Sequence, residues 1–158
     1  MSEQAAKKVN DKKITLNITT PRGLKFVEKA DMVVMRCIDG DLGVLYGHAP
    51  LSAILGDGIL RIYNNGNVKK LALFGGVVEI GKNIVNIFST IAQRPEEIDL
   101  ERAEADRQEL ESIFREKHVE HQIQSSLILL RRALVRIEVS MDLEDVELFE
   151  EESEKREF

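Results

Sequence analysis

The chain has 158 residues, of which 43% are hydrophobic and 32% charged, and its net charge is −6 at pH 7. This length allows one ordinary domain or two small ones, and no apolar run approaches the roughly 18 residues of a membrane-spanning helix. Residues 142–158 carry a net charge of −7, so the other residues carry the balance of +1. A nearly neutral body with an acidic end lacks the clustered positive charge that nucleic-acid binding requires.

The two ends of the chain and its single cysteine bear on where the protein works. Residues 1–12 are polar and mixed in charge, which predicts a flexible extension without a secretory signal. Cys37 cannot form an internal disulfide, as expected in a reducing compartment, and its alternating apolar surroundings favour a buried side chain over a reactive thiol. These features predict a soluble protein of the cytoplasm. The acidic residues 141–158 are expected to form a solvated tail, with an acidic docking segment as the alternative.

Short β-type runs separated by turn signals fill the first part of the chain. Residues 14–19 alternate between apolar and polar side chains and end at a turn signal that contains Pro21 and Gly23. Asn65 and Gly66 tolerate the positive φ angles that a tight hairpin turn requires. Many short strands at this spacing predict a β-sandwich or small barrel, and we expect an antiparallel β-sandwich over residues 13–94. Its strands are expected at 14–19, 32–35, 58–63, 68–74, 77–80 and 84–88.

Glycine and proline are confined to the first part of the chain, which marks a domain boundary. All ten glycines lie at or before Gly81 and all three prolines at or before Pro95. Helices avoid both residues, so the rest of the chain is expected to be helical. The acidic residues of 96–99 suit the first turn of a helix that begins after Pro95. We therefore expect an α+β fold, in which a two-helix antiparallel hairpin over residues 95–140 follows the sandwich.

The two expected helices differ in their apolar faces. The first has a thin face, formed by Ala103, Leu110, Ile113 and Phe114. The second has a narrow stripe at alternating spacings of four and three, which predicts one partner helix; it is formed by Ile123, Leu127, Leu130, Leu134, Ile137 and Met141.

The connection between the helices contains no glycine or proline, so two interpretations stay open: a folded hairpin or one long helix. Such thin faces bury little area, and a docked hairpin is expected to interconvert with an extended arm.

No grouping of residues typical of catalysis is present. The sequence lacks a Ser-His-Asp arrangement, a Walker phosphate loop and a dinucleotide fingerprint, so we expect neither catalytic residues nor a metal centre. His118 and His121 are three residues apart, which is a weak metal signal beside the simpler interpretation of two solvated turn residues. His48 lies at the tip of a glycine-rich segment and is expected to be a turn residue at a protein contact.

Charged residues on the two expected helices carry the strongest binding signal. Arg132 and Arg136 are four residues apart and project from one side of the second helix. A folded hairpin would bring both near Asp99 and Arg102. Three arginines and a carboxylate can hold a polyphosphate and the amino group of a base, because the arginine fork matches phosphate oxygens. The alternative is a solvated helix face with pairs such as Asp99 and Arg102.

Residues 40–51 form the glycine-rich segment Gly40-Asp41-Leu42-Gly43-Val44-Leu45-Tyr46-Gly47-His48-Ala49-Pro50-Leu51. This segment resembles the signature loop of the epsilon subunit of bacterial F-type ATP synthases. The family's ATP-binding motif is similar to Ile98-Asp99-x-x-Arg102-Ala103, and its second helix supplies phosphate-binding arginines at the positions of Arg132 and Arg136. Further matches are Thr20-Pro21-Arg22-Gly23, Gly58-Ile59-Leu60-Arg61 and Gly75-Gly76-Val77-Val78-Glu79-Ile80. Together these segments cover roughly residues 14–140.

The resemblance implies a non-catalytic subunit of a rotary ATP synthase. The sandwich would bind the gamma subunit and the ring of c subunits, and so couple ion translocation to ATP synthesis. Its implied interface residues are Asp41, Leu42, Tyr46 and His48. The helices would inhibit ATP hydrolysis when they extend toward the alpha and beta subunits. The implied location is peripheral, at the cytoplasmic face of the cell membrane and without insertion into it.

The resemblance also implies ATP as a regulatory ligand, with no required cofactor. The implied ATP site is formed by Ile98, Asp99, Arg102, Ala103, Arg132 and Arg136. Members that bind nucleotide often carry a glutamate five positions before Ile98, where this chain has Gln93. The amide removes a charge and keeps a hydrogen-bonding group for adenine. The alternative function is a stand-alone ATP-sensing protein that closes its hairpin, and a small β-sandwich enzyme finds no support because no nucleophile or metal set is present.

Overall fold

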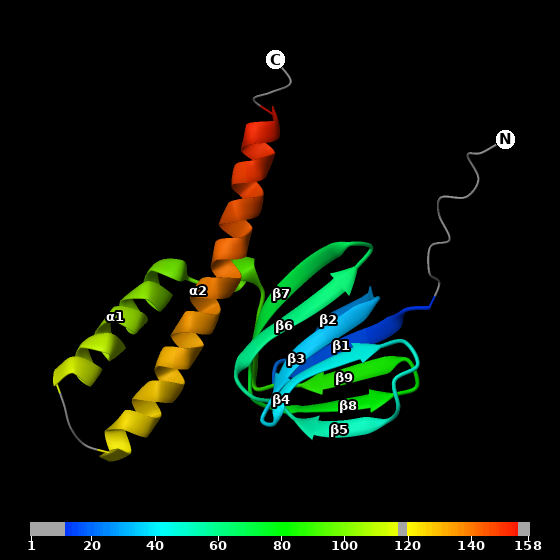
Figure 1. Cartoon of the computed structure of the whole chain (residues 1–158), viewed down its shortest axis with the longest axis horizontal. Coiled ribbons are helices and arrows are strands. Elements are labelled where there is room, and N and C mark those ends of the chain that lie inside the picture. The colour runs from blue at the N-terminus through cyan, green and yellow to red at the C-terminus, as the bar shows by residue number, and fades with distance from the viewer. Residues whose placement is uncertain (1–11, 117–119, 155–158) are drawn as a thin grey trace.

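Two five-stranded sheets pack face to face in the N-terminal part of the chain (Figure 1). This computed structural model describes residues 12–116 and 120–154, and within the second helix it describes the side chains of residues 123–141. The first sheet has the order β2-β1-β9-β8-β5 and contains β1 (Ile14–Thr20), β2 (Gly23–Ala30), β5 (Leu51–Ile54), β8 (Val77–Gly81) and β9 (Ile84–Phe88). The second has the order β10-β7-β6-β3-β4 and contains β3 (Met32–Cys37), β4 (Gly40–Leu45), β6 (Gly58–Asn64), β7 (Asn67–Phe74) and β10 (Ile91–Gln93).

The β-sandwich prediction is confirmed, with one change in strand direction. Neighbouring strands are antiparallel except β1 and β9, which pair in parallel and place Leu16 opposite Val85. The hairpin predicted at Asn65 and Gly66 is present between β6 and β7, with φ angles of 52° and 82°. Gly76 begins the approach to β8 at a φ of 115°, where a Cβ atom would lie 2.0 Å from the carbonyl oxygen of Phe88. Only glycine fits this contact.

The sandwich core lies between the two sheets and consists of aliphatic side chains. Alternate residues of the central strands point inward, as the period of a strand requires. Cys37 is buried among them, as expected. Burial raises the pKa of its thiol, and the nearby carboxylates of Asp39 and Asp41 raise it further. The fully buried side chains include Leu16, Ile18, Val33, Met35, Leu60, Ile62, Val78, Val85 and Ile87.

The segment after the sandwich begins differently from the prediction. Residues 95–97 form a separate 3-10 turn (Pro95–Glu97), and Ile98 then takes an extended conformation with φ −93° and ψ 127°. The helix α1 (Leu100–Glu116) starts after Asp99, whose side chain accepts a hydrogen bond from the Arg102 N–H at 3.1 Å. Glu96 and Glu97 therefore do not lie in the first helical turn. The reason is that Asp99 is the better N-cap.

The structure shows a two-helix hairpin rather than one long helix. The helix α2 (Glu120–Glu154) lies against α1 and separates it from the sandwich (Figure 1). It runs past residue 140, where we placed the end of the hairpin, because no glycine or proline stops it. Its helical backbone therefore includes residues 141–154 of the expected acidic tail. Residues 1–11 of the expected N-terminal extension, and His118 of the candidate metal pair, lie outside the described residues.

The apolar stripe predicted on α2 is not its buried face. Ile123, Leu127, Leu134 and Met141 are exposed, whereas Ala133, Val139 and Ser140 are buried. On α1, Ala103 and Leu110 are buried as expected, but Ile113 is exposed. The reason is that α2 contacts two surfaces, α1 and the outer face of the second sheet, so its buried positions do not form a single seam.

A second, smaller apolar cluster joins α2 to the sandwich. Val139 of α2 packs with Ile59 of β6 and with Ala72 and Phe74 of β7, all of which are buried. The half-buried side chains of Ile91, Ile98 and Val135 complete this docking cluster. These strand residues lie on the outer face of the second sheet, opposite the sandwich core. The docking cluster therefore positions the charged face of α2 over β7.

Candidate functional site

Two of the predicted arginines lie over one aromatic ring at the junction of α2 and the sandwich. The guanidinium carbons of Arg132 and Arg136 are 5.4 Å and 4.7 Å from the centroid of the Phe74 ring. Phe74 itself is buried in the docking cluster. Stacking of a guanidinium on an aromatic face fixes the plane of its fork. Phe74 therefore orders both arginines on the same side of α2.

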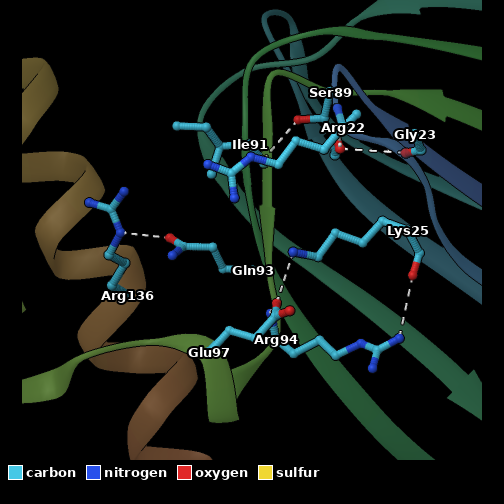
Figure 2. A network of polar contacts seen from close by, with 10 residues as sticks. Arg22, Gly23, Lys25, Ser89, Ile91, Gln93, Arg94, Glu97 and Arg136 are labelled. Carbon is cyan, nitrogen blue, oxygen red and sulfur yellow. Dashed lines mark hydrogen bonds and ion pairs between the residues drawn. The ribbon is translucent and has the colours of Figure 1, made fainter.

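Each arginine also bonds a polar side chain of the sandwich. The Arg132 Nε–H donates to Asp57 Oδ2 at 2.8 Å, and this ion pair is largely buried on the aspartate side. The Arg136 Nε–H donates to Gln93 Oε1, also at 2.8 Å. Figure 2 shows Gln93 reaching from its strand toward α2 to meet Arg136. Gln93 stands where nucleotide-binding members often carry a glutamate, and its amide oxygen accepts a hydrogen bond from an arginine of the same site.

Arg136 is surrounded by both positive and negative side chains. Burial lowers the pKa of Arg136, and the nearby positive charges of Arg132 and Arg102 lower it further. The carboxylates of Asp106 and Asp57 act in the opposite direction. The structure thus brings the three predicted arginines into one electrostatic group. A phosphate group next to them would relieve their mutual repulsion.

The other residues of the predicted ATP motif have structural roles in this arrangement. Asp99 caps α1 through the Arg102 N–H, and Ala103 is buried. Ile98 packs against the docking cluster, while the side chain of Arg102 is exposed. The motif residues are therefore near one another, with Asp99 and Ala103 used by the helix itself. Their role in binding ATP stays a prediction.

A polar groove lies beside the Arg132–Asp57 ion pair. Its volume is about 170 Å³, and it opens between α2 and the outer face of the second sheet. Arg131 and Glu138 line it from the helix, and Asp57 lines it from the turn before β6. Arg36 pairs with Asp41 at 3.1 Å, and Arg61 approaches Glu138 at 3.8 Å. Asp57 thus belongs both to the lining of the groove and to the ion pair.

The predicted interface residues lie in and after β4. Tyr46 is exposed and His48 is half-buried on the loop that follows this strand, and the ring Nδ1 of His48 is 2.6 Å from the Ala49 carbonyl oxygen. Asp41 is exposed and paired with Arg36. Leu42 differs, because its half-buried side chain packs against the sandwich core and offers little surface to a partner. The interface role of these four residues remains a prediction.

Three residues of these sites could not be recognised from the sequence pattern. Asp57 and Phe74 complete the arginine site, and Asn83 accepts a hydrogen bond from the Gly47 N–H at 3.1 Å and so fixes the loop that carries Tyr46 and His48. Asp57 stands between two glycines and Asn83 follows Gly81 and Lys82, so turn signals marked both positions. Nothing in the sequence indicated which distant side chains they would meet.

The part of the chain that the structure describes contains neither a candidate metal site nor a membrane-spanning helix. Within residues 12–116 and 120–154, no group of three His, Cys, Asp or Glu side chains could hold a metal ion. No helix in these ranges is both long and apolar enough to span a bilayer.

The fold and site define a β-sandwich protein with a C-terminal helical hairpin and a cluster of arginines at the junction. Residues 13–95 match the family described as ATP synthase, Delta/Epsilon chain, beta-sandwich domain. The ATP synthase epsilon chain of Lactobacillus delbrueckii subsp. bulgaricus is 38% identical over 136 residues, which are 82% of this chain and 93% of that protein. That of Caldicellulosiruptor saccharolyticus is 34% identical over 122 residues, 77% of this chain and 89% of the relative. The chain belongs to the family of ATP synthase epsilon chains.

A solved structure has the same fold. It is a chain of the Euglena gracilis mitochondrial ATP synthase, in a complex of OSCP, F1 and c-ring. The TM-score is 0.61 at 22% sequence identity, and the match covers 92% of this chain and 89% of that one. At this identity the likeness supports the arrangement of sandwich and hairpin, and it carries no residue-level role.

Proposed function

We propose that this epsilon subunit is a non-catalytic part of the central stalk, which couples ion translocation to ATP synthesis and restrains ATP hydrolysis. Its sandwich binds the gamma subunit and the c-ring, and its helices reach the alpha and beta subunits when they extend. It lies peripherally at the cytoplasmic face of the membrane. The observation that carries this proposal is the match to epsilon chains over most of their length.

An exposed apolar row on the first sheet supports a docking role for the sandwich. Ile54, Val77 and Phe88 stand opposite one another in register. Thr19 pairs with both Phe88 and Leu24, so the row crosses all five strands. The four apolar side chains are exposed, and the helices cover the other sheet (Figure 1). A contiguous apolar patch of this kind is typical of a protein interface, and we assign it to the gamma subunit.

Two matched substitutions test this docking surface. Val77→Glu places a charge in the row on the first sheet, whereas Val68→Glu places the same charge on the second sheet. The two valines are similarly exposed, at 43% and 47%. Co-purification with the gamma subunit and the c-ring should fail for Val77→Glu and persist for Val68→Glu. Equal recovery of both variants would contradict the assignment of this face.

The way that α2 is held supports a movable, nucleotide-responsive arm. Val139 and Val135 provide a small apolar contact, and Arg132, Arg136 and Glu138 add polar contacts to the sandwich. Polar contacts of this kind exchange readily with water, because their net contribution to stability is small. We propose that ATP binds the arginine group and holds the arm against the sandwich, and that release of the arm inhibits hydrolysis.

Binding of ATP to the intact chain tests the nucleotide site. Arg132→Ala and Arg136→Ala should each weaken binding by about 1–3 kcal/mol for the loss of a charged hydrogen bond. Arg115→Ala is the matched control, because Arg115 is an exposed arginine in the last turn of α1. Isothermal titration with ATP gives the three affinities. Equal affinity for all three variants and the wild type would reject the arginine group as the site.

A further inference from the structure

The turn that carries Asp57 is fixed tightly to the sandwich. The Gly56 N–H donates to the Arg36 carbonyl oxygen at 3.0 Å. A Cβ atom at Gly58 would lie 2.7 Å from the Cβ atom of Arg36, so the backbone approaches β3 closely on both sides of the aspartate. The side chain of Asp57 is only 13% exposed. Its carboxylate is therefore presented to α2 from a rigid support.

Asp57 occupies the position that an anionic ligand of Arg132 would take. Its Oδ2 accepts from Arg132 Nε at 2.8 Å, and the same guanidinium stacks on Phe74. A phosphate oxygen and a carboxylate oxygen seek the same donor, because both form charge-assisted hydrogen bonds with the arginine fork. One N–H cannot satisfy both at full strength. The carboxylate also repels a polyphosphate that approaches along the groove it lines.

We propose that Asp57 is an internal substitute for the phosphate group: it holds α2 against the sandwich when no nucleotide is bound, and a bound nucleotide displaces it from Arg132. The competition rests on the nucleotide site proposed above, whereas the holding contact does not. The docked arm of this chain is thus stable without ligand. Nucleotide exchanges one anionic partner of Arg132 for another, which limits how strongly ATP shifts the position of the arm.

The neighbouring charges favour Asp57 over other acidic residues for this role. Glu138 lies on α2 itself and approaches Arg61 only at 3.8 Å. Asp106 raises the pKa of Arg136, as Asp57 does, but Asp106 lies on α1 of the hairpin rather than on the sandwich. Asp41 is paired with Arg36 within the second sheet. Among these groups, Asp57 is the carboxylate that joins the fixed sandwich to an arginine of the arm.

Asp57→Asn tests the proposal, because it removes the charge and retains the shape and an acceptor oxygen. Without ATP, amide hydrogen exchange in residues 123–141 should become faster, and added salt should accelerate it more in the wild type than in the variant. ATP affinity should rise roughly three- to tenfold, because a competing negative charge is lost. Asp39→Asn is the matched control, because Asp39 is an exposed carboxylate on the turn between β3 and β4, and it should change neither quantity appreciably. Unchanged exchange in residues 14–88 verifies that the sandwich is intact.

The outcomes separate this proposal from the nucleotide site on which its second half rests. Faster exchange together with tighter ATP binding supports both halves. Faster exchange with no ATP binding by either protein supports the holding contact and rejects the nucleotide site. Unchanged exchange in Asp57→Asn, or ATP binding that weakens, overturns the role of Asp57.

Discussion

The two apolar cores of this protein differ in size and in what surrounds them. Among the residues that the structure describes, the sandwich core contains 18 buried side chains and the docking cluster under α2 contains four. The sandwich core is enclosed by paired strands. The docking cluster is bordered by arginines, an aspartate and a glutamine instead. The sandwich is therefore expected to keep its fold without the arm, and the arm to depend on the sandwich.

This contrast explains how one chain can combine a fixed part, the sandwich, with a movable part, the arm. Burial of apolar area stabilises by about 25 cal/mol per Å², so the larger core determines the global free energy of unfolding. The docking cluster adds a small local term that a ligand or partner of ordinary affinity can overcome. The following changes test the contrast, beginning with the largest expected effect.

Leu60→Ala in the sandwich core should destabilise the whole protein. Leu60 is fully buried between the sheets, and deletion of a buried leucine side chain costs about 2–5 kcal/mol through lost transfer free energy and a cavity. Urea denaturation followed by circular dichroism measures the free energy of unfolding. Leu134→Ala on the exposed side of α2 is the control and should change it by less than about 0.5 kcal/mol. A similar loss in both variants would contradict the contrast.

Val139→Ala should loosen the arm and leave the sandwich stable. Val139 is buried in the docking cluster, so its truncation should cost about 1–2 kcal/mol of docking free energy. Amide hydrogen exchange distinguishes the two parts, because residues 123–141 should exchange faster while residues 58–74 keep their protection. If both segments lose protection equally, the arm and the sandwich form one cooperative unit.

The same contrast explains which strands could be predicted from the sequence. The expected strands correspond to β1, β3, β6, β7, β8 and β9, which occupy the interior of the two sheets. The four strands without a prediction are β2, β5, β4 and β10, and they are the four sheet edges. An edge strand has fewer neighbours and needs fewer apolar side chains, so its pattern is weaker. In β2, for example, Ala30 is the one fully buried residue.

The arginine site could be predicted in part for a related reason. Arg132 and Arg136 share one helix face, and the spacing of a helix alone places them together. Their partners come from the sandwich: Asp57 is 75 positions from Arg132 in the sequence, and Gln93 is 43 positions from Arg136. No local pattern specifies contacts at such separations. The stripe on α2 was misassigned because a helix between two surfaces does not show the periodicity of a simple helix pair.

Asn83→Ala tests whether the loop after β4 belongs to the fixed part. Asn83 has a φ of 59°, which alanine adopts at a cost of about 1–2 kcal/mol, and its side chain also bonds the Gly47 N–H. The global free energy of unfolding should fall by about 1 kcal/mol, and exchange of the Gly47 amide should accelerate. Asn83→Gly removes the side chain without the backbone cost, so it should accelerate the same amide with less loss of stability.

Glu97→Gln should give the smallest effect, at the joint between the two parts. Burial raises the pKa of Glu97, but the Arg94 N–H, Lys25 and the Arg94 charge together lower it below its ordinary value. The carboxylate lies 2.8 Å from the Arg94 N and 3.0 Å from the Lys25 Nζ. Figure 2 shows the Lys25 side chain reaching toward Glu97. Because the carboxylate is 39% exposed, its loss should cost only a few tenths of a kcal/mol at pH 7.

The stability difference between the wild type and Glu97→Gln should depend on pH. A carboxyl group with a lowered pKa in the folded state stabilises the fold fully above its unfolded pKa of about 4.3, and this contribution is lost as the pH falls through the lowered value. The stability difference between the wild type and Glu97→Gln should therefore be constant near pH 7 and disappear in acid. Urea denaturation at pH 7, 5 and 3 measures it. A difference that grows as the pH falls would show that Glu97 does not join the sandwich to the arm as a carboxylate.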